Sequence, residues 1–287
     1  MPVGTRHVFV TGTSRGIGRA TALRLASAGI SVMAGLRNFN DVAALEREGA
    51  GRVTPVVLDT SLDDSIERAT ETVRSTVGRD GLFALVNNAA GVGNWSPVEY
   101  ASREVLESAF SVTTFGTFLL TRAFMPMIRQ ARGRIVNVGA GRLGLPLLGP
   151  GFGAKLAMEA MTDVLRVELR GTGVRVSIVE PGMTRWEDVE EQLAVYDQGI
   201  EDALRDIRGE DRPRFESVAR HFKALNHRMM ATAAPADRVA ATIQRAITAR
   251  RPRARYHCGW EQKAASWMER LTTERLRDAI VGRMTGL

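Results

Sequence analysis

The chain has 287 residues, of which 44% are hydrophobic, a formal net charge of +7 and a single cysteine, Cys258. One cysteine excludes a disulfide framework within the chain and fits a reducing compartment, so we expect a cytoplasmic protein. No apolar run approaches the roughly 18 residues of a membrane span, and we expect no secretory signal. The arginines are interleaved with acidic residues, which argues against a nucleic-acid surface. No His, Cys or carboxylate cluster has metal-ligand spacing, so no metal site is expected.

Short apolar runs rich in Val and Ile alternate with longer stretches of helical periodicity. Because these runs lack polar alternation, they are typical of strands buried on both faces of a parallel sheet. A seventh strand is expected near Arg255–Cys258, after a helix over Asp237–Ala249. The pattern predicts an α/β fold, a Rossmann-like doubly wound parallel sheet of about seven strands with helices on both faces. The first six runs are His7–Val10, Ser31–Ala34, Val53–Leu58, Leu82–Val86, Arg134–Val138 and Val174–Val179.

Helix signals lie between these runs. Ser61 and Asp64 have the spacing of a capping box before a helix. A periodic stretch over Leu156–Leu169 is followed by glycines at 171 and 173, as at helix ends. Residues 186–234 are polar and helical in pattern, inserted after the sixth strand. Such insertions sit above the ligand crevice, so we expect one domain over 1–287 with a helical substrate lid over 186–234.

The first predicted strand runs into Thr11–Gly18, which reads TGTSRGIG, and a helical pattern follows. Its glycines allow a tight turn and let backbone N–H groups approach a pyrophosphate. The N-terminus of the following helix then faces the phosphate charge. A loop of this kind between a strand and a helix predicts a dinucleotide site.

The end of the second strand suggests which dinucleotide binds. An acidic residue there would bind the ribose hydroxyls of NAD. The sequence instead reads Ala34-Gly35-Leu36-Arg37, without an acid. Arg37 and Arg15 are suited to pair with a 2′-phosphate, which favours NADP(H) over NAD(H). The alternative is that Arg37 is an ordinary surface residue.

These motifs resemble the short-chain dehydrogenase/reductase family over nearly the whole chain. Thr11–Gly18 resembles the family's T-G-x-x-x-G-x-G loop, and Asn87–Gly91 resembles its N-N-A-G signature. Asp59 matches the acid that contacts adenine, and Pro181-Gly182 matches the turn beside the nicotinamide. Residues Pro235–Tyr256 are similar to the hydroxysteroid and retinol dehydrogenase branch. The expected cofactor-binding residues are Gly12, Ser14, Arg15, Gly16, Ile17, Gly18, Arg37, Asp59, Asn88, Ala89, Lys155, Pro181 and Gly182.

The family's catalytic Asn, Ser, Tyr and Lys are mostly missing. Lys155 stands where the Y-x-x-x-K lysine belongs, but the tyrosine position four residues earlier is Gly151. The serine position is Ala140 and the asparagine position is Thr113. A positioned acid typically contributes about 10²–10⁴-fold to carbonyl reduction, so the usual family mechanism is disfavoured. The open positions Ala140 and Gly151, with Met183 and Trp186 after the Pro-Gly turn, are expected to line a pocket for a bulky substrate.

Three functions fit this pattern. The chain could be an oxidoreductase with a relocated proton donor, taken from Tyr196, His221 or His227, with Lys155 and Thr113 as the remaining catalytic candidates. The same chemistry could dispense with an acid if the substrate were an iminium or an activated alkene. Alternatively, the chain could be a catalytically silent subunit that pairs with an active homologue. A third reading is a non-redox reaction, such as cyclisation or dehydration. The family resemblance implies a homo-oligomer or a hetero-oligomer with a homologue.

Overall fold

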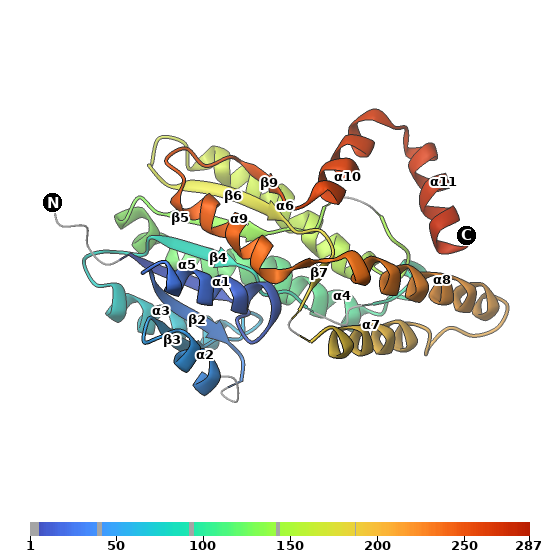
Figure 1. Ribbon diagram of the computed structural model, residues 1–287, viewed down its shortest axis with the longest axis horizontal. Coiled ribbons are helices and arrows are strands. Elements are labelled where there is room, and N and C mark those ends of the chain that lie inside the picture. The colour runs from blue at the N-terminus through green and yellow to red at the C-terminus, as the bar shows by residue number, and fades with distance from the viewer. Residues whose placement is uncertain (1–5, 39–41, 92–94, 142–143, 187) are drawn as a thin grey trace.

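A seven-stranded parallel sheet forms the centre of the computed structural model, which describes residues 6–38, 42–91, 95–141, 144–186 and 188–287. The strands lie in the spatial order β3-β2-β1-β4-β5-β6-β9, and every neighbouring pair is parallel. The predicted fold class is therefore confirmed (Figure 1). The strands are β1 His7–Thr11, β2 Ser31–Leu36, β3 Val53–Val57, β4 Ala84–Asn87, β5 Arg134–Val138, β6 Arg175–Glu180 and β9 Arg255–His257.

Helices cover both faces of this sheet. The side chains of β1 alternate between the two layers: Val8 and Val10 join a cluster with α1 and α9, and Phe9 joins the cluster of α3 and α5. All three side chains are fully buried, and Phe9 packs edge-on against Phe124 with ring centroids 5.0 Å apart. The helices are α1 Gly16–Ser27, α2 Val42–Glu48, α3 Asp63–Val77, α4 Arg103–Phe110, α5 Gly116–Gln130, α6 Gly149–Glu168, α7 Val189–Ala203, α8 Asp211–Thr232, α9 Ala236–Thr248, α10 Trp260–Leu271 and α11 Glu274–Thr285.

Two of the expected helix starts are wrong. Helix α6 begins at Gly149 rather than Leu156, so Lys155 lies in its second turn. A proline at 150 occupies the first turn, where its missing N–H costs nothing. The capping box at Ser61 is absent, because the Ser61 hydroxyl donates to the Asp59 carboxylate at 2.6 Å instead of capping α3.

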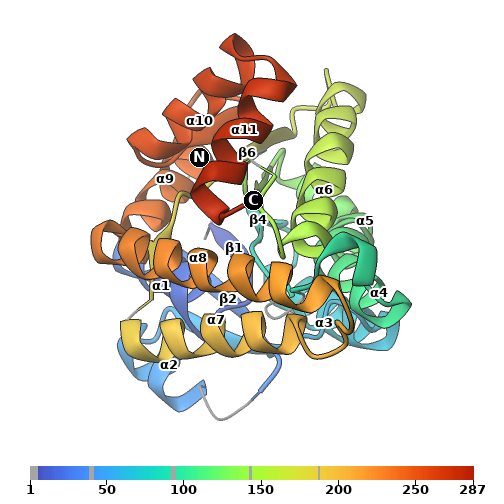
Figure 2. The same ribbon diagram turned by 90° about the vertical axis from the view of Figure 1, so that its right-hand side faces the viewer.

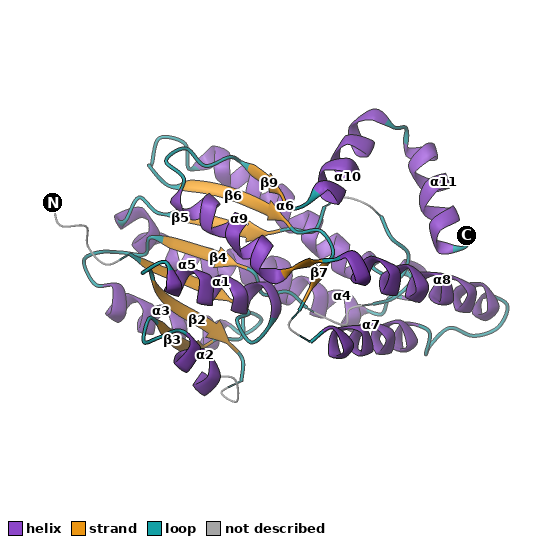
Figure 3. Cartoon of the chain, in the orientation of Figure 1, coloured by secondary structure: helices purple, strands orange, loops and turns teal. Residues whose placement is uncertain are grey.

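The inserted segment forms two helices at the carboxyl ends of the strands. Figures 2 and 3 show α7 and α8 side by side, on the side toward which the strand arrows point. Two short strands, β7 Thr184–Arg185 and β8 Ala234–Pro235, pair in parallel and join the two ends of the segment. A third apolar cluster, which includes Ile200 and Phe222, holds α7 and α8 together.

No helix in the described ranges is long and apolar enough to cross a membrane. Within the same ranges, no group of three or more His, Cys, Asp or Glu residues is arranged to hold a metal ion.

A buried ionic cluster ties α6 to the edge of the sheet. The Arg255 guanidinium on β9 donates to Glu159 of α6 at 2.5 Å and also to Glu180 of β6. The side chains of Glu159 and Glu180 are 1% and 5% exposed. Arg255 therefore pairs with both buried carboxylates, and Glu180 also lies 2.6 Å from His257 Nδ1. Burial lowers the Arg255 pKa, but the two carboxylates outweigh this effect and raise it.

Replacing that cation tests the cluster. Because Arg255→Met leaves the buried Glu159 carboxylate without its cation, we expect the free energy of unfolding to fall by about 3–5 kcal/mol. Urea denaturation measures this change. The control is Arg103→Met, which removes an exposed ion pair to Glu107 and should leave the urea midpoint unchanged. Equal midpoints for both variants would contradict the structural role of Arg255.

Candidate active site

The Thr11–Gly18 loop makes a tight turn between β1 and α1. Gly12 and Gly16 have φ angles of +67° and +60°, a region that side chains disfavour. Gly18 has no room for a side chain, since its Cβ would overlap the carbonyl oxygen of Gly12. A side chain would therefore strain the backbone at Gly12 or Gly16 and would clash with the loop at Gly18.

Side chains after β4 hold this loop in place. Asn88 Nδ2 donates to the carbonyl oxygens of Thr11 and Gly12, at 3.0 and 3.1 Å. In return, the Thr11 hydroxyl oxygen accepts from the backbone N–H groups of Asn88 and Ala89, both at 2.9 Å. Strands β1 and β4 are neighbours whose connections leave in opposite directions, so these bonds lie at the point where open sheets bind ligands.

A groove of about 450 Å³ lies over this loop. Helix α1 begins there without a side-chain cap and without an acidic residue in its first turn, which suits an anionic ligand. The groove and the helix end therefore fit the pyrophosphate of a dinucleotide. The predicted cofactor residues that line the groove are Gly12, Ser14, Arg15, Gly16, Ile17, Arg37, Asn88 and Ala89.

Two other predicted cofactor residues lie beside the groove instead of lining it. Gly18 lies beneath the loop, where it packs against Gly12. Asp59 is half-buried, and its carboxylate accepts from the backbone N–H and the hydroxyl of Ser61, while its neighbours Leu58 and Thr60 line the groove.

Trp186 was predicted to line the substrate pocket, but it lines the cofactor groove instead. The pairing of β7 with β8 turns the chain so that the Trp186 indole covers Gly16. The Arg15 guanidinium stacks over this indole, 4.2 Å from the ring centroid, and pairs with Glu191 of α7 at 2.9 Å. The loop and the lid helix are thus in direct contact.

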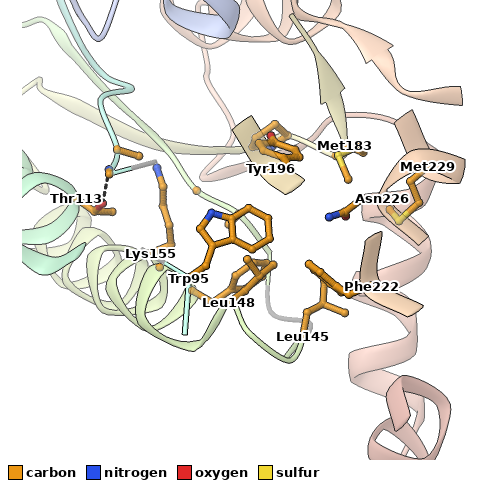
Figure 4. Close-up of a pocket in the computed structure, with 18 of the residues that line it drawn as sticks. Trp95, Thr113, Leu145, Leu148, Lys155, Met183, Tyr196, Phe222, Asn226 and Met229 are labelled. Atoms are coloured by element: carbon orange, nitrogen blue, oxygen red, sulfur yellow. Dashed lines mark hydrogen bonds between the residues drawn. The ribbon is translucent and has the colours of Figure 1, made fainter. Parts of the chain in front are cut away.

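A second cavity of about 390 Å³ adjoins the groove, and both are lined by Ala90 and Gly91. It lies between the carboxyl ends of the strands and helices α7 and α8. Figure 4 shows Lys155 and Thr113 at one end, Asn226 and Met229 at the other, and Trp95 between them. The predicted site residues that line this cavity are Thr113, Ala140, Gly151, Lys155, Pro181, Gly182, Met183 and Tyr196.

Lys155 and Thr113 form the polar end of the cavity. Lys155 Nζ donates to the carbonyl oxygen of Val138 at 2.5 Å. Burial lowers the Lys155 pKa to about 8, and the nearby Glu159 carboxylate opposes that shift. Thr113 lies in a single π-helical turn, Ser111–Phe115, and its hydroxyl oxygen accepts from Gly91 N–H at 3.4 Å. Such turns are frequent at functional sites.

Gly151 and Ala140, the positions at which the sequence predicted the loss of the family tyrosine and serine, differ in the space around them. A Cβ at Gly151 would meet nothing within 4 Å, so the tyrosine position is open. Beside Ala140, a Cβ at Gly139 would overlap the Glu159 carboxylate, which also accepts from Ala140 N–H at 3.2 Å. The strand end that carries the family serine therefore packs here against a buried carboxylate.

Tyr196 reaches the cavity from the lid. Its ring lies between Trp95 and Trp186, with centroid distances of 5.5 and 6.1 Å. Its hydroxyl oxygen accepts from Gln192 Nε2 at 3.1 Å. That amide also donates to the Thr184 carbonyl and accepts from Trp186 N–H, which fixes its orientation. The Tyr196 O–H can therefore donate, and no acceptor for it lies among the described residues.

The two histidines proposed as alternative donors lie outside this cavity. His227 pairs with Asp197 at 3.1 Å on the lid surface. His221 Nδ1 lies 2.8 Å from the Ser217 carbonyl oxygen and packs against Gly286 near the chain end. Of the three proposed donors, Tyr196 alone lines the cavity.

Sequence reasoning missed most of the apolar wall. On α8 a signal existed, because Phe222, Asn226 and Met229 recur at helical spacing along an otherwise polar stretch. Trp95 and the loop residues carried no such pattern. The lining residues that were not predicted include Trp95, Leu145, Leu148, Phe152, Phe222, Leu225, Asn226, Met229 and Gln262.

Comparison with known proteins agrees with this geometry. Residues 6–194 match the family of short chain dehydrogenases. The chain is 34% identical to rat retinol dehydrogenase 16, over 90% of this chain and 82% of the relative. It is 33% identical to rat 17-beta-hydroxysteroid dehydrogenase type 6, over the same shares. A short chain dehydrogenase from Burkholderia cenocepacia, solved in complex with NADP, superposes with a TM-score of 0.71, 22% identity and coverage of 98% and 99%. The chain therefore belongs to the short-chain dehydrogenase/reductase family of oxidoreductases, with retinol and hydroxysteroid dehydrogenases among its relatives.

Proposed function

We propose that this chain is an NADP(H)-dependent reductase of bulky apolar ketones or aldehydes, in which Tyr196 of the lid replaces the missing family tyrosine. The observation that carries the proposal is the Tyr196 hydroxyl, which lines the same cavity as Lys155 and has a proton free to donate. Gly151 offers no acid at the usual position, and the open space there leaves room for a substrate.

The cofactor groove supports NADP(H) as the partner. Arg37 and Arg15 both line the groove, and no acid lies among the described groove-lining residues near the end of β2. A guanidinium is suited to a phosphate because it pairs with two oxygens at once. When bound, NADPH would supply a hydride to the substrate carbon. Lys155, Pro181 and Gly182 line the cavity next to the groove, where they would hold the nicotinamide end.

The protein's own part in the reaction is proton transfer. As the carbonyl carbon is reduced, its oxygen gains negative charge and takes a proton from the Tyr196 hydroxyl. Burial raises the Tyr196 pKa, so the proton is retained at neutral pH, as reduction requires. Donation leaves Tyr196 as a phenolate, which burial disfavours, so the tyrosine would take up a proton from solvent before the next turnover.

Removing the Tyr196 hydroxyl tests its role as proton donor. With 2-acetylnaphthalene as an apolar ketone, we expect Tyr196→Phe to lower kcat by about 10²–10⁴-fold, since the acid is lost. The dissociation constant for NADPH should stay unchanged. The measurement is the loss of nicotinamide absorbance, with NADPH affinity from fluorescence titration. The matched control is Tyr256→Phe, whose hydroxyl accepts from Arg253 N–H and lies outside the cavity.

Three results would contradict this proposal. Full activity of Tyr196→Phe would remove Tyr196 as the donor and favour a substrate that needs no acid. NADPH binding without turnover of carbonyl compounds, reversed by adding an active homologue, would favour a silent partner subunit. NADPH binding together with conversion of a substrate at constant nicotinamide absorbance would favour a non-redox reaction.

The cofactor preference is tested at the end of β2. We expect Arg37→Ser to weaken NADPH binding by about tenfold or more, because a charge-assisted contact to the 2′-phosphate is lost. NADH binding should change little. Fluorescence titration with both cofactors measures the two constants. Arg52→Ser is the control, since Arg52 is exposed at the amino end of β3, away from the groove. An equal loss of affinity for both cofactors would contradict recognition of the phosphate by Arg37.

The lowered pKa of Lys155 predicts a pH-dependent stability. The Lys155 pKa is about 8 in the folded protein, against an ordinary value of 10.5, so the unfolded chain holds that proton more tightly. Stability should therefore rise, relative to Lys155→Met, as the pH increases from about 8 to 10.5. Urea denaturation across this range measures the difference. Lys263→Met, at an exposed lysine, should keep the wild-type profile. Parallel curves of stability against pH for wild type and Lys155→Met would contradict a lowered Lys155 pKa in the folded protein.

A further inference from the structure

The cavity has an unused polar group at the end remote from Lys155. Asn226 is 4% exposed, and its side chain points into the cavity from α8 (Figure 4). Its Nδ2 has no hydrogen-bond partner among the described residues. Its surroundings are apolar, because the nearby cavity walls include Phe222, Met229 and Met183.

The side-chain N–H donors of the other buried amides among the described residues are paired, although Asn87 Oδ1 lacks a partner. Gln192 Nε2 donates to two oxygens, and Asn87 Nδ2 donates to Asn137 and Thr121 at 2.8 and 3.1 Å. A buried donor without a partner costs about 1–3 kcal/mol, which a leucine at the same position would avoid. The Asn226 Nδ2 group therefore stabilises the fold through no hydrogen bond to the described residues.

Resting on the proposed function, we propose that Asn226 determines substrate specificity by donating a hydrogen bond to an oxygen at the far end of the substrate. The substrate class is then an elongated apolar molecule with oxygen groups at both ends. One oxygen is the reacting carbonyl that takes the proton of Tyr196, and the other is a carbonyl or hydroxyl that accepts from Asn226 Nδ2. An analogue without the second oxygen leaves the buried amide unpaired and binds more weakly.

A pair of ligands that differ only at one end tests this assignment. The probes are 2,6-diacetylnaphthalene and 2-acetyl-6-isopropylnaphthalene, which share one ketone end and nearly the same shape. Calorimetric titration of the full chain in the presence of NADP⁺ measures binding without reduction. We expect the diketone to bind about tenfold more tightly, which exceeds the factor of about two given by its two equivalent ends.

Variants at position 226 test whether Asn226 causes the preference for the diketone. Asn226→Leu should reduce the preference to about twofold and should unfold at the same temperature as wild type or higher, since an unpaired buried amide is removed. Asn226→Ala, a smaller change, is the second variant and should lose the same preference. The matched control is Gln198→Leu, which replaces an exposed amide of α7 outside the cavity and should keep the wild-type preference.

The outcomes separate this inference from the proposed function. An Asn226-dependent preference without NADPH oxidation would retain the distal contact and overturn the reductase proposal alone. Oxidation of NADPH with both compounds, but the same preference in wild type and Asn226→Leu, would overturn the role of Asn226 alone. Failure of both compounds to bind would also overturn the inference, because the cavity would then not accept molecules of this class.

Discussion

The close approach of α1 to the end of β1 sets the geometry on which the rest of the site depends. Gly18 packs against the carbonyl oxygen of Gly12, and Asn88 donates to that oxygen and to the carbonyl oxygen of Thr11. This contact fixes where α1 begins and holds the ends of β1 and β4 together. The groove over α1 and the cavity beyond Ala90 both follow from it, because both are lined by the segment after β4.

Contacts of Lys155 and Glu159 hold α6 in place near Gly151 and Ala140. Lys155 still donates to Val138, and Glu159 one turn later is buried against Ala140 and held by Arg255. These contacts position α6 against β5 without help from a serine or a tyrosine. The helix and its lysine are therefore held next to the cofactor groove with glycine at 151 and alanine at 140.

The sequence predicted the elements that carry a local signal. Buried strands such as β1 and β4 contain short apolar runs, Val8–Val10 and Leu82–Val86, and the glycine loop has a strand before it and a helix after it. The start of α6 was missed because Gly149, Gly151 and Gly153 weaken the helical pattern. Trp186 was misplaced because its direction depends on the β7–β8 pairing, a contact between segments about 50 residues apart. The ionic cluster at Arg255 joins residues 75 and 96 positions apart, which no spacing reveals.

Placing the donor on the lid changes how the site is held together. A tyrosine at position 151 would share a helix with Lys155, so their separation would be fixed by one turn of α6. Tyr196 instead shares α7 with Gln192, which orients its hydroxyl, and with Glu191, which pairs with Arg15 of the cofactor loop. An exposed ion pair contributes little to stability, so the position of α7 depends mainly on the apolar cluster that it forms with α8. Because Phe222 of α8 belongs both to that cluster and to the cavity wall, a substrate contact at Phe222 and the placement of the proposed donor depend on the same packing.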